Sequence, residues 1–547
     1  MTSSQPRTLA DFGTLTAAEQ KVLDELDTGE IIILGVDVPD ETAGEDRLIR
    51  ARFLRWVILT NGEPVSDETW PKPRTYRLHE KGVQVTGALI TGEGEYRNAH
   101  AALDLQGAEV AYDALLTDCL FTAKPNLLGA RMQGVILNRS RLPGLRADGL
   151  QTRGDLFMRG IESAGEVRLL GAQIGGDLDF TGSTLRNANH RAFSADLALI
   201  AGSLFLHNAS TAGEVSLLGA KIGGDLECGG AKLANESGKA LNADGALITG
   251  TFFWRPDGEG NQPSTCGEID LTGADIGRMS DDPACWPRKG DLLLNRCRYG
   301  AFTGKGTKGA ERIDWLSRHR HFFGRFEPQP YEHCAKVLRE MGHQEDARKV
   351  LIEKERLQHA ARRKEQGDGP SRLAIWLWDT FLRITVAYGH KPFIAVWWLL
   401  AFWVAGQMAY HSAWSADAFK PNNPFILRSA EWVRCGAEIA DTVALAVPGD
   451  NSAPQAVVRG LRAEGQTRQD CFMALAEGES FPSFHAGIYS LDVLFPLVEV
   501  EQQANWIPDE DRPVGAIAKV MMYVQIIAGW ALSLLAVAGL SGIIKSD

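Results

Sequence analysis

The strongest constraint on the fold is that the chain copies a long part of itself. Residues 165–206 begin GEVRLLGAQIGGDLDF, residues 213–254 begin GEVSLLGAKIGGDLEC, and the two stretches match without a gap, so that Gly165 corresponds to Gly213 and Leu206 to Trp254. A third start, GEIDLTGADIG, follows at Gly267, and residues 147–157 match residues 195–205 at the same offset. Repetition at a fixed offset indicates an array of stacked units rather than one closed core.

Within each copy, short stretches that alternate apolar and polar residues, such as EVRL and GDLDF, are separated by glycine. Alternation predicts strands, and glycine at the breaks predicts tight corners. We therefore predict a mainly β fold, a right-handed parallel β-solenoid. A β-sandwich is the alternative, but nothing in a sandwich requires an equal-length copy. Asp177 is expected to point outward, and the side chains expected to point into the stack are Val167, Leu169, Ile174, Leu178, Leu185, Val215, Leu217, Ile222, Leu226 and Leu233.

Two long uncharged runs lie near the C-terminus, at residues 393–410 and about 520–544. At about 1.5 Å rise per residue, either run can cross a hydrocarbon core of about 30 Å. The alternative is a buried helix of a large soluble domain. Before the first run, residues 373–386 mix bulky apolar side chains with Asp379 and Arg383, which predicts a helix lying along the inner leaflet. The alternative is a continuation of the transmembrane helix, but Gly389 and Pro392 favour a break.

The two spans are predicted to leave both termini in the cytoplasm, with an external loop at residues 411–515. The N-terminal residues are polar and lack the apolar core of a signal peptide. The positive-inside rule adds weak support, and Cys435 and Cys471 fall on the external loop, where a disulfide between them is an open question. The cations counted on the cytoplasmic side are Arg362, Arg363, Lys364, Arg372, Arg383, Lys391 and Lys545, against Lys420, Arg428, Arg512 and Lys519 on the loop side.

Between the repeats and the spans, residues 330–366 have helical periodicity that breaks at Gly342 and His343. This pattern predicts a helix-turn-helix pair. Its packed face is expected to contain Tyr331, Ala335, Leu338, Ala347, Val350 and Leu351. The predicted domains are a helical or capping segment at 1–80, the β-solenoid at 81–310, a helical linker at 311–370 and a two-pass α-helical membrane domain at 371–547.

Four blocks of sequence are similar to a bacterial family labelled membrane-associated oxidoreductase. They are LTAAEQKVLDELDTGE from Leu15, the GALITG and LLGAxIGGDL units, the block FEPQPYEHCAKVLREMGHQEDARKVLIEKER from Phe326, and YSLDVLFPLVEVEQQANWIP from Tyr489. The resemblance covers nearly the whole chain. It implies a pentapeptide-repeat-like solenoid, a two-helix, ion-channel-like C-terminus in the bacterial inner membrane, and, by the family's label, oxidoreductase activity.

The residues themselves give no catalytic, cofactor-binding or metal site. Residues 304–309 (GKGTKG) fit G-x-G-x-x-G, but a dinucleotide site needs a second strand that ends in an acidic residue, and here Glu327 precedes prolines. His319 and His321 form an HxH pair surrounded by arginines, which oppose a cation. We therefore expect no cofactor and no metal.

The loop between the spans contains a candidate pore segment, because residues 485–500 are apolar enough to re-enter the membrane. No TVGYG-like filter follows, so potassium-type selectivity is not predicted. The candidate pore-loop residues are Tyr489, Asp492, Glu499 and Glu501. The two glutamates form either a cation-attracting ring in an oligomer or ordinary solvated loop acids.

Small and polar residues in the second span predict a homo-oligomer. Gln525 would prefer a partner inside a bundle to lipid, and small residues spaced four apart allow close helix packing. The alternative is that they pack only against the first span of the same chain. These helix-packing candidates are Gln525, Gly529, Ser533, Ala538 and Gly542.

Three functions are compatible with this organisation. The first is a non-enzymatic scaffold, anchored in the lipid bilayer, whose cytoplasmic solenoid binds an unknown protein. The second is an ion-channel-like protein or membrane effector gated by that solenoid, and the third is the oxidoreductase of the family label. The formal net charge of -12 argues against a general nucleic-acid binder.

Overall fold

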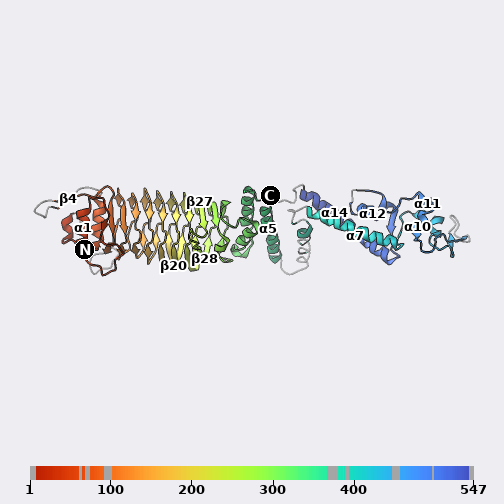
Figure 1. Cartoon of the computed structure of the whole chain (residues 1–547), viewed down its shortest axis with the longest axis horizontal. Coiled ribbons are helices and arrows are strands. Elements are labelled where there is room, and N and C mark those ends of the chain that lie inside the picture. Colours follow the sequence, from red (N-terminus) through yellow and green to blue (C-terminus); the bar gives the residue numbers. More distant parts are fainter. Residues whose placement is uncertain are drawn as a thin grey trace. The chain divides into compact units, whose positions relative to one another are not determined.

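The computed structural model describes residues 8–60, 65–67, 74–91, 102–365, 376, 380–385, 387, 393–445, 456–495 and 498–540. The chain divides into two compact units, Met1–Ala361 and Arg362–Asp547 (Figure 1). We refer to them as the N-terminal unit and the C-terminal unit.

Two long parallel β-sheets build the N-terminal unit, and Figure 1 shows their strands stacked side by side. The 17-stranded sheet consists of β1 (Ile32–Ile33), β5 (Val83–Thr86), β7 (Glu109–Val110), β8 (Ala114–Thr117), β10 (Arg131–Met132), β11 (Val135–Ile136), β14 (Gln151–Thr152), β15 (Leu156–Phe157), β18 (Gln173–Ile174), β19 (Leu178–Asp179), β21 (Leu199–Ile200), β22 (Leu204–Phe205), β24 (Lys221–Ile222), β25 (Leu226–Glu227), β27 (Leu247–Trp254), β29 (Asp275–Asp281) and β31 (Arg298–Phe302). The 12-stranded sheet consists of β2 (Leu48–Arg50), β6 (Leu89–Thr91), β9 (Leu120–Phe121), β12 (Arg141–Leu142), β13 (Leu145–Arg146), β16 (Glu162–Ser163), β17 (Val167–Arg168), β20 (Thr184–Ser194), β23 (Ser210–Ser216), β26 (Lys232–Asn242), β28 (Ser264–Asp270) and β30 (Leu292–Leu293).

Strand pairing explains the offset seen in the sequence. Gln173 of β18 pairs with Leu199 of β21, and Leu199 pairs in turn with Lys221 of β24. Gln173 and Lys221 are equivalent positions in the two copies, so one copy covers two successive passes of the chain through the same sheet. The predicted parallel β structure is confirmed. The sheets also begin earlier than the predicted boundary at residue 81, because β1 and β2 already pair with β5 and β6.

The interior of this stack is apolar, as the alternation predicted. All ten side chains expected to point inward are at most 2% exposed. Asp177, which was expected to point outward, is half-buried, and its Oδ1 accepts the backbone N–H of Ser203 at 2.8 Å. Asp155 Oδ1 accepts the N–H of Asp177 at 2.8 Å, and Asp225 Oδ1 accepts that of Thr251 at 2.6 Å. These carboxylates join one pass of the chain to the next.

Glycines at the corners let successive passes approach closely. A Cβ atom at Gly223 would lie 2.3 Å from the carbonyl oxygen of Ala201, and one at Gly175 would lie 2.2 Å from that of Arg153. Neither distance leaves room for a side chain, so the GG pairs that mark the repeat in the sequence are required by backbone stacking.

Helices and buried ion pairs close both ends of the stack. Near the N-terminus are η1 (Leu9–Phe12), α1 (Ala17–Glu25) and α2 (Ala51–Leu59), and the fully buried carboxylate of Glu19 accepts Arg50 Nε at 2.8 Å and Nη2 at 2.6 Å. At the other end, the two Nη atoms of buried Arg312 donate to Asp281 at 2.8 and 2.6 Å, and Trp286 Nε1 donates to the same carboxylate at 2.8 Å. Pairing makes these buried charges tolerable.

The helices that follow the sheets include the predicted pair. They are α3 (Gly309–Leu316), η4 (Phe322–Gly324), α4 (Gln329–Glu340) and α5 (Gln344–Glu365), whereas η3 (Pro283–Cys285) lies earlier, between β29 and β30. The turn between α4 and α5 contains Gly342 at φ 89°, at the predicted break. Five of the six expected packing residues are buried, and Leu351 packs partly buried against the same core.

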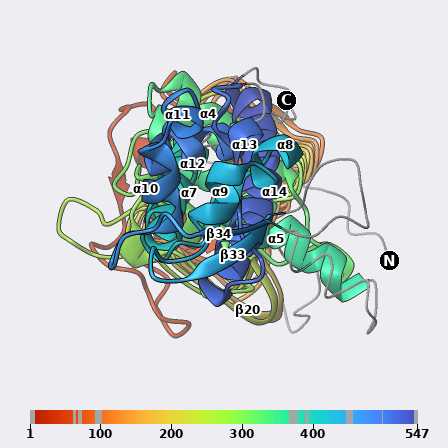
Figure 2. The ribbon, with the colours of Figure 1, turned by 90° about the vertical axis from the view of Figure 1, so that its right-hand side faces the viewer.

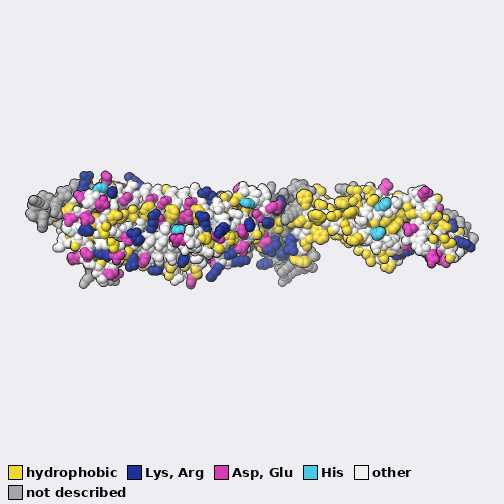
Figure 3. All heavy atoms as spheres, in the orientation of Figure 1, with side chains coloured by type: hydrophobic (Ala, Val, Ile, Leu, Met, Phe, Trp, Pro, Cys, Tyr) yellow, Lys and Arg dark blue, Asp and Glu magenta, His cyan; other side chains and the backbone are white. Residues whose placement is uncertain are grey.

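The C-terminal unit contains two helices long and apolar enough to cross a membrane, α7 (Phe393–Ser415) and the described part of α14 at Pro513–Ala538. α14 continues to Leu540. Both helices extend past the predicted runs on the loop side, because helical geometry continues through polar residues such as His411 and Lys519. Figure 3 shows hydrophobic side chains gathered over this unit's surface. Residues 541–544 and most of the predicted helix at 373–386 lie outside the described residues.

Between the two long helices lies a small disulfide-linked region. Cys435 and Cys471 form a disulfide and are buried beside Trp432 and Phe472. The other six cysteines are free thiols in the N-terminal unit. The elements of this region are β32 (Phe419–Pro421), α8 (Pro424–Leu427), α9 (Ala430–Arg434), β33 (Thr442–Leu445), β34 (Ala456–Arg459), α10 (Arg468–Met473), α11 (Ala476–Glu479), α12 (Ala486–Leu494), α13 (Gln502–Asn505) and β35 (Trp506–Pro508).

Candidate functional site

The short helix α12 packs against both long helices of the C-terminal unit (Figures 1 and 2). Ser490 Oγ donates to the carbonyl oxygen of Trp403 in α7 at 2.9 Å, and Trp403 Nε1 donates to that of Gly487 at 3.0 Å. On the other side, a Cβ atom at Gly529 of α14 would lie 1.8 Å from the carbonyl oxygen of Leu494. The segment is therefore held tightly between α7 and α14.

Gln525 joins the three helices at one polar point. Its Nε2 donates to the carbonyl oxygen of Phe402 at 2.7 Å and to Ser490 Oγ at 2.9 Å, and its Oε1 accepts Tyr410 Oη at 2.6 Å. The side chain of Gln525 fits there because Gly406 has no side chain: a Cβ atom at Gly406 would lie 2.2 Å from Gln525 Nε2. Gln525 is fully buried. Its hydrogen bonds are thus made within one chain, and an oligomer cannot be argued from this side chain.

Helix geometry gives the depth of α12 along α7. At about 1.5 Å per residue, Trp403 lies roughly 15 Å from Phe393 and roughly 18 Å from Ser415. The first turn of α12 contacts α7 at Trp403 through Gly487, and its last residue, Leu494, clusters with Ala395 and Leu399. α12 therefore runs from the loop side past the middle of α7.

The chain then turns back, and Asp492 holds the returning part in place. The carboxylate of Asp492 accepts the N–H of Val500 at 3.1 Å and that of Gln503 at 2.8 Å. Gln502 Nε2 donates to the carbonyl oxygen of Ser483 at 3.0 Å, and its Oε1 accepts the N–H of His485 at 3.1 Å. We call residues 486–495 and 498–505 the helix–return segment. Its return passes the level of Asp492 and ends beside the start of α12.

The return carries two exposed carboxylates. Glu499 and Glu501 are exposed, as are Val498 (42%) and Val500 (38%), and Glu501 has a left-handed backbone with φ 59°. Val500 is fixed to Asp492, whose helix position lies between Ser490 at the level of Trp403 and Leu494. The backbone of Val500 therefore lies near the middle of α7, measured along its length, and Glu501 follows it towards the loop end, where Gln502 bonds to His485.

The structure distributes the predicted pore-loop and packing residues among different roles. Asp492, Glu499 and Glu501 come together on the helix–return segment. Tyr489 does not join them, because it is fully buried, its hydroxyl donates to Met522 Sδ at 3.6 Å, and its ring stands edge-on to that of Tyr410.

Among the packing candidates, Gly529 lies under the end of α12, whereas Ser533 and Ala538 are partly exposed. Gly542 lies outside the described residues. Sequence reasoning missed Ser490 and Gly406. Their signal was present: a glycine within the first uncharged run and a serine within the apolar re-entrant stretch are both unusual unless helices touch there.

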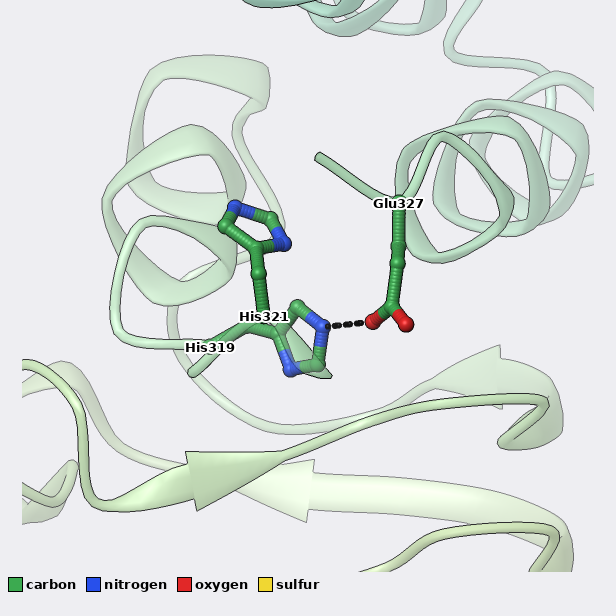
Figure 4. A group of neighbouring side chains, drawn as sticks. All are labelled: His319, His321 and Glu327. Carbon is green, nitrogen blue, oxygen red and sulfur yellow. Dashed lines mark hydrogen bonds and ion pairs between the residues drawn. The ribbon is translucent and has the colours of Figure 1, made fainter. Parts of the chain in front are cut away.

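A second cluster brings His319, His321 and Glu327 together, with one ligand atom of each within 4.8 Å of the others (Figure 4). His319 Nε2 lies 3.0 Å from Glu327 Oε2, and its Nδ1 accepts the backbone N–H of Leu294 at 3.1 Å. A neutral ring that accepts at Nδ1 carries its proton on Nε2, so Nε2 cannot ligate a metal. Burial and the neighbouring His319 lower the pKa of His321. The cluster acts as a structural hydrogen-bond network.

The glycine-rich loop at residues 304–309 is explained by packing against its own unit. A Cβ atom at Gly304 would lie 2.2 Å from the carbonyl oxygen of Asp281, and Gly306 has φ 80°. Lys305 Nζ pairs with Asp282 at 3.1 Å. These contacts account for the glycines without a bound phosphate.

No family model, no curated protein and no solved structure matches the chain. The resemblance drawn from the sequence therefore stays a prediction, and the function has to be argued from the geometry of the helix–return segment.

Proposed function

We propose that the C-terminal unit is an ion-conducting pore module, in which α7 and α14 span a membrane and the helix–return segment re-enters it between them. The observation that carries this proposal is the packing of α12 against both spans near their middle, with Asp492 bracing a return that bears two carboxylates. Ionisable residues inside a membrane are costly, so their presence favours a functional pathway.

The disulfide supports a topology in which the loop faces an oxidising compartment and both termini face the cytoplasm. Disulfides persist in oxidising compartments, whereas free thiols are typical of reducing ones. The Cys435–Cys471 bond lies between the spans, and the six free cysteines lie before them. The distribution of lysine and arginine is weaker evidence for this topology, because the loop between the spans also carries Arg434, Arg459, Arg462 and Arg468, which reduce the positive-inside bias. The bacterial inner membrane remains the proposed location.

In this proposal Glu499 and Glu501 select cations, because rings of carboxylates attract cations and repel anions at a constriction. The N-terminal unit, which we propose is a right-handed β-solenoid, acts as the cytoplasmic gating domain. The helix pair α4–α5 precedes the first span in sequence and would carry the signal.

The test is a flux assay on the full chain in liposomes. Cation flux is expected for the parent and a loss of at least about tenfold for Glu499→Gln with Glu501→Gln, which removes the two charges and keeps the shape. Glu464→Gln, an exposed acid elsewhere in the loop, should retain parental flux. Equal cation flux in all three proteins would contradict the proposal.

The scaffold function keeps one specific observation in its favour. The larger sheet carries exposed leucines, Leu199 at 44% and Leu247 at 40%, beside a shallow groove of about 380 Å³ lined also by Ile174, Ile200 and Ile222. A cytoplasmic protein partner binding this surface is the second proposal. Loss of co-purifying protein from a Leu199→Asp, Leu247→Asp variant that still folds would support it.

The oxidoreductase proposal is tested by absorbance of a co-purified flavin or nicotinamide.

A further inference from the structure

We infer that the C-terminal unit functions as a homo-oligomer, in which identical copies meet around the exposed face of the return, Val498–Glu501, and enclose the water-filled path between them. The inference rests on the proposed pore function and states where the path lies: between copies and not within one.

The interior of a single copy is closed over the residues that the structure describes. The space between α7, α12 and α14 is occupied by the buried side chains of Gln525, Ser490 and Tyr410, which satisfy one another through hydrogen bonds. The side chains of Gln525 and Ser490 lie directly against Gly406, and the backbone of Leu494 lies directly against Gly529, so these contacts leave no channel beside them. Water therefore has no route between these three helices, and a path must lie on their outer surface.

The return cannot face lipid. A carboxylate at the centre of a membrane costs roughly 2.5–3.5 kcal/mol on insertion scales, and the proposed function puts Glu499 and Glu501, both exposed, inside the membrane. The backbone of Val498–Glu501 lies outside any helix or strand, and non-helical backbone at membrane depth is tolerated only against protein or a water-filled cavity. Within the segment, Asp492 accepts the N–H of Val500, the carbonyl oxygen of Phe495 accepts that of Val498 at 3.1 Å, and the carbonyl oxygen of Glu501 accepts Asn505 Nδ2 at 2.7 Å. The two exposed carboxylates still need water, and the irregular backbone that bears them needs protein beside it.

A second copy of this chain supplies both the protein contact and the water-filled space. Rotational symmetry places Glu499 and Glu501 of every copy around one axis, so the same loop, repeated once per copy, forms a ring of carboxylates in a hydrated environment. Apolar Ile488, 45% exposed, and Val498 flank the acids on the same segment and provide the surface for contact between neighbouring copies.

Cross-linking tests this interface. In full-length protein carrying Cys266→Ser, which removes the exposed thiol, Val498→Cys should give covalent dimers with a short bis-maleimide in native membranes, the largest species that one reactive thiol per chain can form. Val404→Cys, exposed at the level of Trp403 on α7, should stay monomeric. The mass of the unsubstituted chain in detergent gives an independent measure of copy number.

The outcomes separate this inference from the proposed function. A covalent dimer from Val498→Cys together with an oligomeric mass supports the inference, even if the liposomes show no flux, in which case the pore function fails and the interface stands. A monomeric mass with no cross-linking from Val498→Cys overturns the inference. Cation flux from such a monomer would leave the pore function standing.

Discussion

Asp177 in the N-terminal unit and Asp492 in the C-terminal unit each accept a backbone N–H from another part of the chain, the former from Ser203 and the latter from Val500. Asp177 belongs to a column in which Asp155 and Asp225 do the same for neighbouring passes, whereas Asp492 has no such copies in the described segment. In the N-terminal unit, side-chain hydrogen bonds to the backbone therefore recur at equivalent positions of successive passes. In the C-terminal unit, the corresponding hydrogen bonds depend on Asp492 and on the network around Gln525.

Disrupting the apolar interior of the repeated unit should have the largest effect. Leu226→Asp puts an unpaired charge at a fully buried position, which costs about 4 kcal/mol or more. Leu178→Asp should behave alike. Hydrogen exchange of the full chain should show lost protection in β22, β25 and β27, which pair through Leu226 and its neighbours.

The matched control is Leu247→Asp, on a 40% exposed side chain of the same sheet, which should stay within about 0.5 kcal/mol of the parent. Equal protection in Leu226→Asp and Leu247→Asp would mean that the strand phase is wrong.

Removing the amide of Gln525, which joins the three helices of the C-terminal unit by hydrogen bonds, should have the next largest effect on stability. Gln525→Leu leaves Tyr410 Oη and Ser490 Oγ without their amide partner, which should lower stability by about 1–2 kcal/mol. The expected result is a lower midpoint of thermal unfolding in detergent. The control is Ile527→Leu, an exposed position two residues away, which should leave that midpoint unchanged. An unchanged midpoint in Gln525→Leu would show that the hydrogen bonds of Gln525 do not contribute to stability.

Asp177→Ala should have the smallest of these effects. It removes the acceptor for the N–H of Ser203 and should destabilise the N-terminal unit by about 1 kcal/mol, spread over neighbouring passes. Asp177→Asn keeps an acceptor oxygen and should restore most of the loss. A denaturation midpoint for Asp177→Ala equal to that of the parent would return Asp177 to the outward, uninvolved position that alternation alone predicts.

The sequence predicts the parts that depend on local pattern. Alternation placed Leu178 and Leu226 in the interior, Gly342 marked the helix break, and the uncharged runs marked the two long helices. Long-range pairings are not encoded in such patterns. The two passes of unequal length within one copy, the partners of Asp177 and the bond between Cys435 and Cys471 depend on which segments meet in space. For the same reason Gln525 pointed to an oligomer from sequence alone, although its partners lie in its own chain.

The central claim is that the return lies at mid-membrane and faces water, and cysteine accessibility tests it most directly. In sealed vesicles of the full chain carrying Cys266→Ser, Val500→Cys should react with a small charged thiol reagent at least about tenfold faster than Val404→Cys, because only water ionises and solvates the thiol. Two equally slow rates would place the return in lipid or in packed protein, and two equally fast rates would place α7 in bulk water. Either result would contradict the pore account.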